Sequence, residues 1–136
     1  MIVADCNLMV YFWLPGGHLT ELAERVKAED GVWAAPILWR AEFRNVLAGF
    51  LRKGSLSEAE ANTAYLSAQN DLGENEYTVP TERIIKLVLA SNCSAYDCEY
   101  VALAQDLGAP LVTADQQLLK AFPKMAVSME KFGKQK

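Results

Sequence analysis

At 136 residues, with 51% hydrophobic and 22% charged residues, the chain has the length and composition of one globular domain, residues 1–136. This composition excludes a disordered protein, and the uncharged stretch at residues 6–20 is too short and too interrupted to span a membrane. The formal net charge is −4, which disfavours a nucleic-acid binder, but five lysines against one glutamate in residues 120–136 keep that class open.

Cysteine and histidine usage indicates the compartment and the absence of zinc. The three cysteines form no CxxC pair, and His18 is the only histidine, so no zinc site is expected. The first residues carry no basic leader and place Asp5 inside an apolar stretch, which argues against a secretory signal. We therefore expect a cytoplasmic protein that does not associate with membranes.

Short apolar runs alternate with amphipathic segments along the chain. Strands are predicted at residues 2–4, 32–35, 76–79, 110–113 and 126–129, and helices at residues 8–13, 20–28, 37–53, 57–70, 80–89, 94–107 and 116–119. Alternation of this kind predicts an α/β fold, a three-layer α/β/α sandwich around a mainly parallel sheet of about four or five strands. Residues 131–136 are expected to form a mobile tail.

The predicted helix at residues 37–53 is apolar around most of its circumference. Such a helix is buried on two sides, so one side should meet the sheet and the other a second helix or a second subunit. Glu42 interrupts the apolar surface, and a glutamate there requires partners. It either reaches solvent, or pairs with Arg40 or Arg44, or belongs to a polar site.

Three aspartates stand at junctions between predicted elements. Asp5 and Asp115 each follow a strand, and Asp97 lies in the first turn of a helix, on the apolar face that also carries Tyr100. Each has an ordinary alternative role, because aspartate is a preferred residue at helix N-termini. The carboxyl ends of parallel strands share one edge of a sheet, where ligands bind.

In a right-handed α/β fold, Asp5, Glu42, Asp97 and Asp115 are expected at that same edge. Four carboxylates without a cation would repel one another, and a divalent cation relieves the repulsion. Oxygen ligands without histidine or thiolate favour Mg²⁺ or Mn²⁺. Such a site can activate water and stabilise a phosphodiester under attack.

The four stretches at residues 2–7, 36–47, 94–107 and 110–115 together resemble the PIN-domain family, and in particular its VapC-type toxins from type II toxin–antitoxin pairs. The resemblance covers nearly the whole chain, but residues 54–82 match only in being helical. It implies a Mg²⁺- or Mn²⁺-dependent endoribonuclease, an RNA substrate, a homodimer, and a cognate antitoxin whose tail fills the site.

By this resemblance, Asp5, Glu42, Asp97 and Asp115 are the catalytic residues, which bind metal or position water, and Asn7 and Thr113 support the site. Two other classes stay open. A phosphatase or receiver-type phosphorylation domain also places an aspartate after its first strand, although Asn7 stands where a phosphatase needs a second acid. A non-catalytic PIN-like binding module is the other.

Overall fold

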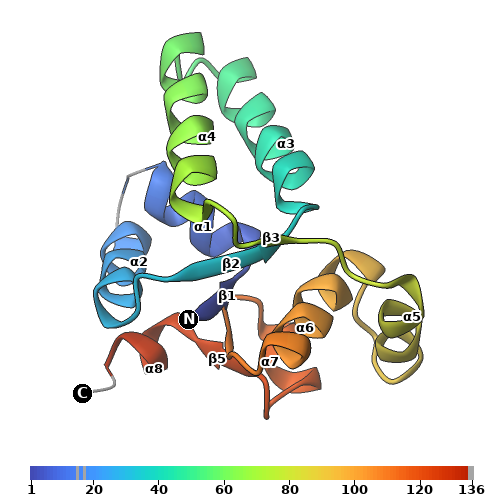
Figure 1. The fold of residues 1–136 in the computed structure, drawn as a ribbon. Coiled ribbons are helices and arrows are strands. Elements are labelled where there is room, and N and C mark those ends of the chain that lie inside the picture. Colours follow the sequence, from blue (N-terminus) through green and yellow to red (C-terminus); the bar gives the residue numbers. More distant parts are fainter. Residues whose placement is uncertain (15, 17, 135–136) are drawn as a thin grey trace.

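A five-stranded parallel sheet forms the centre of the protein (Figure 1). The computed structural model describes residues 1–14, 16 and 18–134. Within these residues the strands are β1 (Ile2–Ala4), β2 (Trp33–Pro36), β3 (Glu76–Tyr77), β4 (Leu111–Thr113) and β5 (Ala126–Ser128). Their order in the sheet is β3-β2-β1-β4-β5, and every neighbouring pair is parallel. The predicted three-layer sandwich around a parallel sheet is confirmed.

Helices cover both faces of this sheet (Figure 1). In chain order they are α1 (Cys6–Trp13), α2 (His18–Glu29), α3 (Trp39–Arg52), α4 (Glu58–Leu72), α5 (Thr81–Leu89), α6 (Ala95–Leu107), α7 (Gln116–Ala121) and α8 (Met129–Gly133). Among the helices that the structure describes, none has both the length and the apolar character needed to cross a bilayer.

The central strand β1 contributes to two separate apolar cores. Ile2 and Ala4 belong to a core built with α1, α2, α3, α4 and α8, whereas Val3 belongs to a core built with α5, α6 and α7. Because successive side chains of a strand point to opposite faces, three consecutive buried residues supply both cores. The acidic residue that follows β1 therefore lies where the two cores meet.

The boundary between β2 and α3 differs from the prediction. The predicted strand ended at residue 35 and the predicted helix began at residue 37, but Pro36 is the last residue of β2, and α3 begins at Trp39. The amide of Ala35 donates to the carbonyl of Asn75, just before the edge strand β3, at 3.1 Å, and the amide of Ile37 donates to that of Tyr77 in β3 at 2.9 Å. The missing amide of Pro36 therefore removes no hydrogen bond from this pairing, and the strand tolerates it.

The end of the chain also differs from the prediction. A mobile tail was expected from residue 131, but residues 129–133 form α8, with Ser128 as its N-cap. Met129 and Phe132 are buried, and α8 packs against α2, so apolar burial holds this segment to the domain. Residues 135 and 136, and Pro15 and Gly17 of the expected chain break, lie outside the described residues.

The apolar circumference of α3 is used inside the domain. Trp39, Phe43 and Leu47 are buried in the first core, and Tyr65 of α4 stacks on Trp39 with ring centres 5.2 Å apart. Helices α1 and α4 therefore pack against the second side of α3. Phe12 also packs against this core, edge-on to the rings of Trp13 and Trp33.

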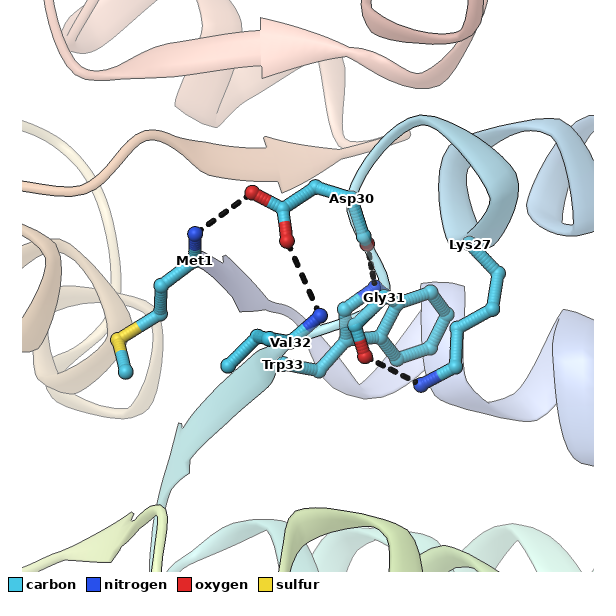
Figure 2. Close-up of polar contacts among 6 residues, drawn as sticks. All are labelled: Met1, Lys27, Asp30, Gly31, Val32 and Trp33. Atoms are coloured by element: carbon cyan, nitrogen blue, oxygen red, sulfur yellow. Dashed lines mark hydrogen bonds and ion pairs between the residues drawn. The ribbon is translucent and has the colours of Figure 1, made fainter.

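At the end of the sheet where β1 and β2 begin, hydrogen bonds fix the start of both strands (Figure 2). Asp30 accepts a hydrogen bond of 2.6 Å from the α-amino group of Met1 and one of 3.0 Å from the amide of Val32. Lys27 closes the same turn by donating to the carbonyl of Gly31 at 2.9 Å. These contacts set the pairing of β1 with β2 from the end of the sheet opposite the predicted acidic residues.

A polar clamp fastens the first turn of α3 to the edge strand β3. Arg40 donates two hydrogen bonds of 2.7 Å to the Glu76 carboxylate, and the Trp39 indole donates a third at 2.5 Å. The hydrogen bonds from Arg40 hold the pKa of Glu76 below its usual value, against partial desolvation. Because Glu42 lies in the same first turn of α3, the clamp also sets where Glu42 stands.

We predict that Glu76→Gln lowers the free energy of unfolding by roughly 1–2 kcal/mol at pH 7, a value that allows for solvent screening of the exposed arginine. A carboxylate with a depressed folded-state pKa stabilises the protein above its unfolded pKa, and this contribution is lost as the pH falls through the lower folded value. Urea unfolding at pH 7 and pH 3.5 should therefore show the difference shrinking at the lower pH. An equal difference at both values would contradict an ionic clamp.

Candidate active site

The four predicted acidic residues line one cavity of about 220 Å³ at the carboxyl ends of β1 and β4. Asp5 follows β1, Asp115 follows β4, Asp97 lies in the first turn of α6 and Glu42 in the first turn of α3. Asn7 lies at the rim and is exposed. The other residues around the cavity are Cys6, Asn45, Val46, Tyr100 and Leu118.

Asp5 is the deepest of the acids, with 6% of its surface exposed. Its Oδ1 caps α1 by accepting the amide of Leu8 at 2.9 Å, and its Oδ2 accepts the hydroxyl of Thr113. Burial raises the pKa of Asp5 to about 6, against these hydrogen bonds and with a smaller push from Asp115 and Asp97. Asp5 is thus both a cap and a poorly neutralised charge.

Asp115 also combines two roles. Its Oδ1 caps α7 by accepting the amides of Gln117 at 2.8 Å and Leu118 at 3.3 Å. Its own amide donates to the hydroxyl of Thr113 at 3.0 Å, which links it to Asp5 through a single side chain. The capping alternative is therefore correct for Asp5 and Asp115, and each carboxylate uses one oxygen for it.

Asp97 has a different local environment. The N-cap of α6 is Ser94, whose hydroxyl accepts the Asp97 amide at 3.0 Å. Burial and the neighbouring charge of Asp115 raise the pKa of Asp97, and hydrogen bonds with Ser94 act in the opposite direction. Asp97 is therefore not the N-cap itself, but it takes part in the start of the helix through its contacts with Ser94.

Glu42 reaches the cavity from α3 and is held by a tyrosine. The Tyr100 hydroxyl donates to Glu42 Oε1 at 2.6 Å. Burial raises the pKa of Glu42, the Tyr100 hydrogen bond opposes this, and the charge of Asp97 adds to it. Pairing with arginine is wrong, because Arg40 binds Glu76 and the Arg44 guanidinium donates to the backbone carbonyl of Arg40.

Two polar residues of the cavity were not predicted as site residues. Tyr100 lies three positions after Asp97 on the same face of α6, and this spacing was the available signal. Asn45 lies one turn after Glu42 on α3 and is exposed at the cavity. The two supporting residues that were predicted differ, since Thr113 contacts Asp5 whereas Asn7 makes no hydrogen bond to the acids within the described residues.

A larger cavity of about 640 Å³ lies between the end of α1, α3 and α4. Its walls include Trp13, Phe50 and Leu56, and Glu60 is the one titratable residue among the described residues that line it. The larger volume of this cavity therefore does not make it the candidate active site. The smaller cavity is the candidate, because carboxylates of perturbed pKa converge there.

The donor set of the acid cavity fits a hard divalent cation. Four carboxylates and two amides offer oxygen ligands, and the lining within the described part of the chain includes no histidine, lysine or arginine. Across that same part, no three acidic, cysteine or histidine side chains already form a metal-binding group. A cation would thus both neutralise these carboxylates and draw them closer together.

Comparison with known proteins agrees with this architecture. A family model described as PIN domain matches residues 2–124. The curated protein Ribonuclease VapC3 from Pyrobaculum aerophilum is 29% identical over 125 residues, which span 90% of this chain and 95% of that protein. The crystal structure of PAE2754 from the same organism has a TM-score of 0.73 at 21% identity, and the match covers 97% of this chain and 92% of that one. The likeness to PAE2754 concerns the fold alone.

We predict that Asp5→Asn stabilises the metal-free protein at pH 8 by about 1–3 kcal/mol, because asparagine still caps α1 but carries no buried charge. A folded-state pKa of about 6 lies above the unfolded value, so the parent protein loses stability as the pH rises from about 4 to about 6. Urea unfolding in EDTA should show similar stabilities at pH 4 and a gain for the variant at pH 8. Asp106→Asn, at the surface, is the matched control, and a variant without any gain at pH 8 would refute the buried charge.

Proposed function

The chain belongs to the PIN domain family, and from this premise we propose that it is a metal-dependent endoribonuclease that hydrolyses RNA phosphodiester bonds. The observation that carries the proposal is the convergence of Asp5, Glu42, Asp97 and Asp115 on one cavity whose described lining holds no cationic side chain. The name of the relative Ribonuclease VapC3 supports a ribonuclease. We infer that the cofactor is Mg²⁺ or Mn²⁺.

The four acids would hold the metal ion, with Asp5, Asp97 and Asp115 on one side and Glu42 reaching in from α3. When bound, a divalent cation activates a water molecule and stabilises negative charge on a phosphodiester. The oxygens that serve as caps on Asp5 and Asp115 are held by backbone amides, so these two carboxylates need little reordering. Preorganised ligands of this kind lower the cost of binding a cation.

The remaining polar residues support the same chemistry. Thr113 orients both Asp5, through its hydroxyl proton, and the backbone at Asp115, through its hydroxyl oxygen. The amide groups of Asn7 and Asn45 lie at the exposed side of the cavity, where they can donate hydrogen bonds to phosphate oxygens. The chain thus supplies neutral donors for the RNA backbone and keeps its carboxylates for the metal.

We also propose that the protein is the toxin of a type II toxin–antitoxin pair, with a cognate antitoxin that fills the acid cavity. The relative named VapC3 supports this assignment, and its match extends over 95% of that protein. A short DNA-binding protein encoded immediately upstream, which co-purifies with this chain and inhibits it, would agree with the assignment. A free-standing gene would instead indicate a housekeeping nuclease.

We further propose a homodimer, which forms through the exposed apolar face of α5. Leu89 and Ile85 are 82% and 52% exposed, and Tyr96 at the start of α6 is 62% exposed. Apolar side chains of this size gathered at the surface favour a protein contact. Of residues 37–53, which the sequence suggested for a subunit contact, Trp39, Phe43 and Leu47 pack inside the domain, whereas Leu51 is 39% exposed.

Hydrolysis is tested with labelled single-stranded RNA. We expect cleavage in Mn²⁺ or Mg²⁺, none in EDTA, and a rate lower by roughly 100-fold or more for Asp97→Asn, because the variant loses a charged ligand. Asp106 lies on the same helix and pairs with Arg83 at the surface. The Asp106→Asn variant, the matched control, should therefore cleave RNA like the parent. Cleavage that persists in EDTA would refute the metal-dependent reaction. A protein that binds RNA and metal without cleaving would be a PIN-like binding module.

Dimerisation is tested by sedimentation at micromolar concentration, where we expect a mass near twice the 15.0 kDa of one chain. Leu89→Glu should shift the protein to the monomer, because it places a charge in the apolar contact. Leu66→Glu is the matched control, since Leu66 is 54% exposed but lies on α4. A monomer at every concentration would contradict the proposed dimer. If only Leu66→Glu produced a monomer, the dimer contact would lie on α4 rather than on α5.

A further inference from the structure

Tyr100 links the two helices that carry the non-capping acids of the cavity. It lies on α6 three residues after Asp97, and its hydroxyl reaches across to Glu42 of α3 at 2.6 Å. The side chain is 3% exposed, so its hydroxyl requires a partner inside the protein. Within the described residues, that partner is Glu42.

Glu42 depends on this contact more than the aspartates depend on theirs. Asp5 and Asp115 are short side chains whose carboxylates are tied to backbone amides of the helices that they cap. Glu42 has one more rotatable bond, and Tyr100 is its single hydrogen-bond donor in the described part of the chain. A freely rotating glutamate loses side-chain entropy when it binds a metal ion. A hydrogen bond that already holds the glutamate in place reduces that loss.

We propose that Tyr100 is a positioning residue, which holds Glu42 with one carboxylate oxygen engaged and the other available to the divalent cation. The inference rests on the proposed function, because it assumes that the acid cavity binds a metal. Tyr100 itself touches neither the RNA nor the metal. It acts through the orientation of Glu42.

The chemistry of the donor supports this role. An arginine in place of Tyr100 would orient Glu42 equally well, but its positive charge would neutralise the carboxylate and compete with the metal. A phenol donates one hydrogen bond and leaves the negative charge on Glu42. The neighbouring arginines are engaged elsewhere, with Arg40 on Glu76. The carboxylate is thus oriented by a neutral group, which is the arrangement a metal ligand requires.

The test is Mn²⁺ binding by the purified metal-free protein, measured by calorimetry and by the shift of the thermal midpoint with Mn²⁺ concentration. Tyr100→Phe should weaken Mn²⁺ binding by about 10-fold, the effect typical of losing a hydrogen bond to a metal ligand. Tyr77→Phe is the matched control, because the hydroxyl of Tyr77, on β3, donates to Asn75 at 3.4 Å and makes no hydrogen bond to Glu42. This variant should bind Mn²⁺ like the parent. Equal affinities for all three proteins would overturn the inference.

A second variant approaches the same contact from Glu42 and leaves the buried ring of Tyr100 in place. Glu42→Asp keeps the charge but shortens the side chain by one methylene, so the carboxylate no longer reaches the hydroxyl. If Tyr100 acts through Glu42, adding Tyr100→Phe to Glu42→Asp should weaken Mn²⁺ binding by less than about twofold more. A further tenfold loss in the double variant would show that Tyr100 acts independently of Glu42 and would overturn the inference.

The parent protein separates this inference from the proposed function. A parent that fails to bind Mn²⁺ would overturn both. A parent that binds Mn²⁺ and cleaves RNA, together with a Tyr100→Phe variant of unchanged affinity, would overturn only the role of Tyr100. Thermal midpoints in EDTA report folding of each variant, so a loss of affinity in a variant that melts like the parent supports positioning rather than a general structural role.

Discussion

The acid cavity requires several negative charges to stay close together in a protein that must fold before any cation neutralises them. The structure meets this requirement with neutral donors. The Asp5 carboxylate is held by a backbone amide and by Thr113, and Glu42 is held by Tyr100. A neutral hydrogen bond lowers the cost of burying a carboxylate without removing its charge. The remaining repulsion is retained in the folded state, where the proposed binding of a divalent cation would release it.

Cap and ligand are compatible roles for an aspartate at a junction between a strand and a helix. A carboxylate has two oxygens, and in both Asp5 and Asp115 the cap uses Oδ1. The same helix start that needs an acceptor also fixes the direction of the second oxygen. Asp97 does not share this arrangement, because Ser94 caps its helix. The acid cavity therefore uses the architecture of parallel α/β folds, in which strands end and helices begin at one edge.

Local signals in the sequence were sufficient for most of the fold and for the four acids. Apolar runs ended by polar residues mark β1 and β4, and Asp5 and Asp115 stand directly after them. Contacts between segments distant in the sequence could not be predicted from such local patterns. The pairing of Glu42 with Tyr100 spans 58 positions, and neither residue type selects the other. Periodicity likewise shows that α3 is apolar around most of its circumference, but not that α1 and α4 cover it.

The strand order has a consequence for protein synthesis. β1 is the first strand made, yet in the sheet it lies between β2 and β4, and its contact with β4 brings together Asp5 and Thr113, which are 108 positions apart. Domains emerge from the ribosome amino-terminal end first. Until β4 has emerged, one side of β1 is an unpaired edge, the second core is incomplete, and Asp5 remains a solvated carboxylate. The acid cavity can therefore assemble only when nearly the whole chain has been translated.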